Sequence, residues 1–142
     1  MLILDNDVFE TKLPTIEERR NTGMLELRKR LKSYYSTKRR LDPFLKKTEI
    51  NKLTFAMLGD VNAPFLHAKG AESKHIAGFV LDLLMEFAAV LGEAGQLLLN
   101  AGRPVQEYAN LIDKCPRKLK PNELERAMQL CVKHVKCYEQ AG

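Results

Sequence analysis

Hydrophobic positions recur at three- and four-residue intervals along most of the chain, which is the spacing of helices that bury one face. Such runs follow Thr15, Ser73 and Pro121. No segment alternates hydrophobic and polar positions over a convincing length, and no internal repeat or heptad run is present. The pattern predicts an all-α protein, an irregular bundle of about five helices.

Capping and breaking residues set the expected bounds of the first elements. Residues 1–14 are acidic and end in Pro14, so we expect an extended N-terminal arm before a single helical domain over residues 15–142. Thr15 and Glu18 have the spacing of a capping box and start the first helix. Asp42 and Pro43 start the second, which we expect to stop near Gly59 before a loop that reaches Ser73.

The segment 74–100 is expected to form a central apolar helix, capped by Ser73 and broken at Gly102–Pro104. Its polar residues fall within about 80° of one another on a helical wheel, and nearly all other positions are apolar. Two shorter helices follow, from Pro104 to about Lys114 and from Pro121 or Asn122, where Asn122 and Glu125 have capping spacing.

The apolar sides of the central segment have an alternative use as a groove for a partner helix or a second copy, because small residues allow close approach. A membrane span is disfavoured by three acidic residues near its middle, Asp82, Glu86 and Glu93. The candidate partner-binding residues are Phe79, Leu83, Phe87, Gly92 and Gly95.

Charge is distributed unevenly along the 142 residues, whose net charge is +5 and whose pI is about 9.2. Residues 17–47 carry +7, residues 71–113 carry −4 and residues 114–138 carry +5. A local excess of cations favours polyanions, acidic proteins or anionic membrane surfaces as partners.

The densest basic run, residues 28–40, interleaves cations with tyrosines and hydroxyls, a combination that suits phosphates and unpaired bases. The alternative is the solvated face of a surface helix with Tyr34 or Tyr35 in the core. The candidate nucleic-acid-binding residues are Arg28, Lys29, Arg30, Lys32, Tyr35, Lys38, Arg39, Arg40, Lys118 and Lys120.

Catalytic and metal chemistry is not favoured. Cys115, Cys131, His134 and Cys137 suggest a zinc site, but on one helix Cys131 and Cys137 lie about 9 Å apart along the axis and about 120° apart around it. The carboxylates of Asp82 and Glu86 offer too few converging oxygens for a divalent cation. We expect no cofactor and no enzyme activity. An odd number of cysteines and no secretory signal indicate a reducing, cytoplasmic compartment, with the nucleus left open.

Two functions fit these patterns best, and an enzyme that uses Asp82, Glu86 or the cysteine and histidine cluster is the least favoured third. The first is a nucleic-acid-binding helical protein, or a small non-catalytic subunit of a nucleoprotein assembly, that uses a basic helix face; DNA and RNA are not distinguished. The alternative is a protein-interaction adaptor or regulator that acts through an apolar helix surface, including as a homo-oligomer.

Overall fold

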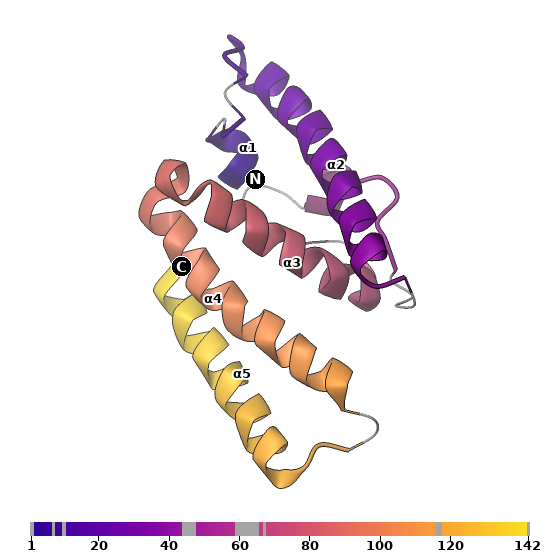
Figure 1. Ribbon diagram of the computed structural model, residues 1–142. Coiled ribbons are helices and arrows are strands. Elements are labelled where there is room, and N and C mark those ends of the chain that lie inside the picture. Colours follow the sequence, from indigo (N-terminus) through magenta and orange to yellow (C-terminus); the bar gives the residue numbers. More distant parts are fainter. Residues whose placement is uncertain are drawn as a thin grey trace. The chain divides into compact units, whose positions relative to one another are not determined.

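The all-α prediction is confirmed. The computed structural model describes residues 2–6, 8, 9, 11–43, 48–58, 66, 68–115 and 118–141, and in these residues there are helices and no strand. The helices, labelled in Figure 1, are α1 (Leu2–Asp5), α2 (Ile16–Leu41), the short 3-10 helix η1 (Phe55–Leu58), α3 (Gly70–Glu86), α4 (Ala88–Lys114) and α5 (Pro121–Ala141).

The chain forms two compact units, Met1–Phe79 and Val80–Gly142, and the boundary falls within α3. Each unit has buried hydrophobic side chains of its own. That residues 15–142 form a single domain stays a prediction.

Helix α2 organises the first unit. It begins as predicted after Thr15, whose side chain accepts a hydrogen bond from the backbone N–H of Glu18 while the Glu18 carboxylate accepts one from Thr15. This reciprocal capping box satisfies two amides that have no partner within the helix. The side chains buried along α2 recur at three- and four-residue intervals and are Met24, Leu27, Leu31 and Tyr35.

The sequence had indicated an extended N-terminal arm, but part of this arm is helical. Residues 2–5 form the four-residue α1, which packs against α2. Leu4 is buried and approaches α2 where Gly23 has no side chain, because a Cβ there would lie 2.8 Å from the Leu4 Cδ2. Asp5 pairs with Arg20 at 2.7 Å. Glycine weakens a helix interior, but Gly23 makes room here for the arm.

The helix expected over residues 43–59 is wrong for the residues described there. Residues 48–54 are not helical, and only η1 follows them; residues 44–47 and 59 lie outside the description. Ile50 and Leu53 are buried in the first unit, and their backbone groups bond to side chains of α2. Two backbone groups of the segment 48–53, the Ile50 N–H and the Leu53 carbonyl, thus find side-chain partners on α2 in place of helical ones.

The continuous central helix expected over residues 74–100 is also wrong. Helix α3 starts earlier, at Gly70, with the Glu72 carboxylate accepting from the Lys69 N–H, and it ends at Glu86. A second interruption lies at Gly92, whose φ of 58° and ψ of −142° are not helical. Apolar periodicity continues across both breaks, so the hydrophobic pattern does not show them, although Gly92 and Gly95 are residues at which the sequence allows a bend.

Replacing Gly92 by alanine tests this break, because a continuous and an interrupted helix predict changes of opposite sign in the free energy of unfolding. Alanine in a continuous helix would raise the free energy of unfolding by about 1 kcal/mol. At the observed φ we expect a decrease of about 1–3 kcal/mol, measured by urea denaturation. Gly70→Ala is the control, because a Cβ there meets nothing within 4 Å and its φ is ordinary. A stabilised Gly92→Ala protein would contradict the break.

Helices α4 and α5 form an antiparallel hairpin in the second unit (Figure 1). Pro104 does not end the helix as predicted but lies buried inside α4. A proline there removes one N–H and disturbs the carbonyls of the preceding turn. One of these carbonyls, that of Ala101, accepts a hydrogen bond of 2.8 Å from the His134 Nδ1 of α5, so His134 ties the two helices together.

The start of α5 is capped by a different residue pair from the one predicted. The Glu123 carboxylate accepts a 2.7 Å hydrogen bond from the Lys120 N–H, so the pair is Lys120 and Glu123, in place of Asn122 and Glu125. The helix begins at Pro121, one of the two predicted starts. Proline suits this first position because its missing N–H would have had no partner there.

Candidate functional site

A basic groove of about 360 Å³ lies between α2 and the segment 48–53 in the first unit. Five of its lining residues are cationic and one, Glu49, is acidic. The residues that line it are Arg28, Lys29, Leu31, Lys32, Tyr35, Arg39, Glu49, Ile50, Asn51, Lys52 and Leu53.

Most of the predicted basic residues of α2 share one side of the helix. At about 100° per residue, five of them lie within an arc of about 120° that also holds the exposed Ser36. With Lys52 from the neighbouring segment, they make up what we call the basic face: Arg28, Lys29, Lys32, Arg39, Arg40 and Lys52.

Two predicted contacts, Arg30 and Lys38, do not belong to this face. Each lies about 140° from its centre by the same helical geometry. Arg30 pairs with Glu26 at 3.0 Å and covers the Phe9 ring, and Lys38 lies over the Tyr34 ring. These two cations serve the packing of the first unit, so neither is a member of the candidate site.

Two members of the basic face hold the neighbouring segment in place. The Arg28 Nε donates a 2.6 Å hydrogen bond to the Leu53 carbonyl in a partly buried position. The Arg39 guanidinium pairs with both oxygens of Glu49, at 2.5 and 2.6 Å. Both bonds come from the Arg39 Nη1, so one nitrogen is shared between the two carboxylate oxygens. The groove is therefore built by cations whose own charges are partly compensated.

The other four members of the basic face have no strong ion-pair partner. Lys32, Arg40 and Lys52 form no ion pair with any residue in the described part of the chain. Lys29 lies 3.7 Å from Glu26, but 81% of its side chain is exposed, and such a pair contributes little. Lys29, Lys32, Arg40 and Lys52 thus present positive charge to solvent along one side of the first unit.

Tyr35 cannot stack on a base, which corrects its predicted role. It is only 3% exposed, and its hydroxyl accepts a hydrogen bond from the Ile50 N–H at 3.4 Å. Burial raises the pKa of Tyr35, which keeps the hydroxyl neutral. Tyr34 is half-buried and packs against the Phe79 ring, with centroids 5.6 Å apart. The tyrosines of α2 are therefore core residues, the alternative that the sequence had left open.

The predicted contacts Lys118 and Lys120 are exposed but belong to the second unit, whereas the basic face is a feature of the first. The second unit holds eight Lys or Arg and eight Asp or Glu, and its net charge is zero. The first unit holds fifteen bases and ten acids and carries the whole net charge of +5. Electrostatic attraction of a polyanion would therefore act mainly on the first unit.

The predicted partner-binding residues do not form an open surface. Phe79 and Leu83 are 5% and 3% exposed. Gly92 lies at the helix break, Gly95 is buried and Phe87 is half-buried between α3 and α4. Apolar residues spread around a helix are buried where neighbours surround it, and most of this stretch is core. Exposed apolar side chains are concentrated instead on α5 and the second half of α4.

No metal-binding cluster is found where the chain is described, because nowhere in that part do three His, Cys, Asp or Glu side chains come together. Cys131 is exposed, whereas Cys115 and Cys137 are half-buried. Loss of solvation and the nearby Glu123 raise the pKa of the Cys115 thiol, which disfavours the thiolate that metals and nucleophilic catalysis require. None of the described helices has the length and hydropathy of a membrane span.

Comparison of the sequence and fold with protein-family models, with curated proteins and with solved structures gave no significant match.

Proposed function

We propose that this protein binds nucleic acid through the basic face of α2, by contacts to the phosphate backbone. The observation that carries the proposal is the set of four cations without strong partners, Lys29, Lys32, Arg40 and Lys52, on one side of a well-anchored helix. Cations so placed neutralise phosphates and release the counterions condensed on them. A small non-catalytic subunit of a nucleoprotein assembly would use the same contact.

The helix dipole explains only part of this charge. Lys38, Arg39 and Arg40 lie in the last turn of α2, where cations stabilise any helix. Lys29 and Lys32 lie in the middle of α2, where the dipole gives no such benefit. A cationic stripe that extends beyond the last turn supports a partner of opposite charge.

Backbone contact is favoured over base stacking. Tyr35 is buried and Tyr34 packs against Phe79, so neither tyrosine of α2 is offered to a base. Arg28 is partly committed to the Leu53 carbonyl, which leaves it less free to read a base edge. Contacts to phosphates carry no sequence information, and we expect weak sequence preference.

The salt dependence of binding tests the proposal. With four phosphate contacts, affinity should fall about 50-fold for single strands and about 150-fold for duplexes between 50 and 200 mM salt. Fluorescence anisotropy with labelled single- and double-stranded DNA and RNA measures this fall and distinguishes the four ligands. The triple variant Lys29→Ala, Lys32→Ala, Arg40→Ala should keep about one contact, and its slope should fall to about a quarter of the wild-type value.

A matched control removes the same charge from the other sides of α2. Arg19→Ala, Arg30→Ala, Lys38→Ala also lowers the net charge from +5 to +2 but leaves the basic face intact. This variant should keep most of the wild-type slope. An equal decrease in the salt-dependence slope of the two triple variants would show that only the net charge determines binding. If the wild type does not bind nucleic acid at 50 mM salt, the proposal is refuted.

A further inference from the structure

Helix α5 has two apolar faces, of which α4 covers one. The covered face contains Ala127 and Leu130, 4% and 2% exposed, and His134, which bonds to Ala101 of α4. The other face follows a 4-3-4-3 spacing, and most of its side chains are more than half exposed. It consists of Leu124, Met128, Cys131, Val135 and Tyr138.

This spacing is that of a seam along which one helix packs on another. It covers only about two heptads, too short for the three or four that identify a coiled coil from sequence alone. The structure shows that this seam is not the face of α5 that packs within the chain, because α4 covers the neighbouring face of the same helix.

Helix α4 extends the exposed surface. Val105, Tyr108 and Ile112 are each 38% exposed and recur at three- and four-residue intervals. The ion pair between Glu107 and Arg126, at 2.7 Å, marks one side of the hairpin. In an antiparallel pair, helical geometry places Val105 and Ile112 on the opposite side, together with the seam of α5. We call this combined surface, with Val132 beside it, the open face.

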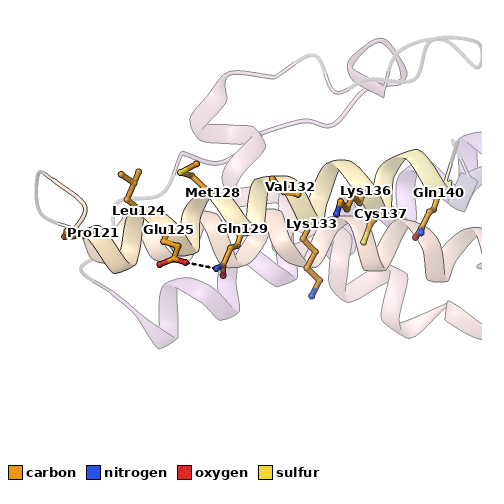
Figure 2. A pocket seen from close by; sticks show the side chains of 10 residues that line it. All are labelled: Pro121, Leu124, Glu125, Met128, Gln129, Val132, Lys133, Lys136, Cys137 and Gln140. Carbon is orange, nitrogen blue, oxygen red and sulfur yellow. Dashed lines mark hydrogen bonds between the residues drawn. The ribbon is translucent and has the colours of Figure 1, made fainter.

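The edge of the open face is visible along α5 (Figure 2). A shallow groove of about 800 Å³ runs there, and all ten residues that line it belong to α5. Leu124 and Met128 project from one side of the helix, and Lys133 projects from the other. The Glu125 carboxylate accepts a hydrogen bond from the Gln129 side chain at 3.4 Å, and Lys136 follows along the same polar border.

The exposed apolar area of the open face is comparable to one side of a small protein interface. Its eight large apolar side chains are 38–63% exposed. With about 60–120 Å² of apolar area for a fully exposed aliphatic side chain and about 150–250 Å² for a tyrosine, they present about 330–600 Å². The largest apolar patch on a typical monomer is about 300–600 Å², and a stable complex buries about 800 Å² per partner.

We propose that the open face binds a second copy of this chain, with α5 antiparallel to α5 of the second copy. Two-fold symmetry pairs any patch with itself, so the patch must complement itself. In this alignment Leu124 lies opposite Val135 of the second copy, and Met128 lies opposite Cys131 of the second copy.

The charges beside the seam also fit this alignment. Glu125 and Lys136 lie on the same flank of α5, about 100° and 120° from the centre of the seam. Antiparallel pairing brings Glu125 of one copy to Lys136 of the other, and the symmetry repeats the pair. The neutral second unit adds no net repulsion to this association.

Sedimentation equilibrium of the full chain tests the proposal, with the 16.2 kDa mass of one chain as the reference. The wild type should be a dimer at micromolar concentrations, at both 50 and 200 mM salt. Met128→Lys with Val135→Lys should raise the dissociation constant at least about 100-fold. Both side chains are exposed in one protomer, so the variant should fold, which circular dichroism checks. Val90→Lys, at an equally exposed position outside the open face, should leave the dimer intact.

Charge exchange tests the alignment itself. Glu125→Lys or Lys136→Glu alone should raise the dissociation constant about 5- to 10-fold, and the double variant should restore most of the loss. A wild type that is monomeric at 100 µM would overturn the proposal, as would a dimer that survives Met128→Lys with Val135→Lys. Failure of the double exchange to restore association would overturn the antiparallel alignment.

Discussion

Replacing Met24 by alanine is expected to lower the free energy of unfolding of the first unit by about 2–5 kcal/mol. Met24 is 1% exposed and is among the largest fully buried side chains. Its truncation leaves a cavity that helices fixed by capping and ion pairs cannot close completely. A unit of about 80 residues has a total stability of roughly 4–12 kcal/mol, so this loss is a large share of it.

The Met24→Ala substitution should impair only the function that we assign to the first unit. Where Met24→Ala is unfolded, the basic groove is lost, nucleic-acid affinity falls, and the proposed dimer persists because it uses only the second unit. Urea denaturation followed by circular dichroism measures the stability. Leu25→Ala is the control, because Leu25 is 61% exposed and the substitution should change stability by no more than about 0.5 kcal/mol.

Leu130→Ala is expected to have the opposite effect on the two functions: dimerisation should be lost and nucleic-acid binding kept. Leu130 is 2% exposed on the face of α5 that packs against α4. We expect a loss of about 2–5 kcal/mol, confined to the second unit. The hairpin that carries the open face would loosen, so dimerisation should be lost while salt-dependent nucleic-acid binding remains.

The control for this variant is Lys133→Ala, an exposed position on the same helix, which should change little. Dimerisation stabilises the folded state in proportion to concentration, so the variants are compared at one protein concentration. If Met24→Ala and Leu130→Ala each unfold the whole chain in a single transition, residues 15–142 behave as the single domain predicted from sequence, and the opposite functional patterns expected here are wrong.

The sequence predicted helices well where local signals agreed with tertiary packing. Thr15 and Glu18 marked the start of α2, and Pro121 marked the start of α5. It failed where packing overrode local signals. Pro104 lies within α4, beside a carbonyl that bonds to His134, a residue 33 positions away. Residues 48–54 carry a helix-like spacing of apolar positions but bond to α2.

The candidate site was partly predictable for the same reason. The density of cations in residues 28–40 identified the helix, but which of them share a face depends on where α2 is buried. Arg30 and Lys38 pack on Phe9 and Tyr34, and Tyr35 enters the core. Lys52 was not selected, because its proximity to α2 depends on a segment whose structure was predicted wrongly.

The tyrosines offer a way to follow each unit separately without a label. The chain has no tryptophan and four tyrosines, two in each unit. Tyr34 and Tyr35 form a tilted ring pair with centroids 5.9 Å apart, an asymmetric environment that gives the first unit a near-ultraviolet circular dichroism signal. Tyr108 and Tyr138 belong to the open face, so their fluorescence reports its hydration when the protein is diluted. Melting of one unit and separation of two copies thus have distinct optical signatures in the unmodified protein.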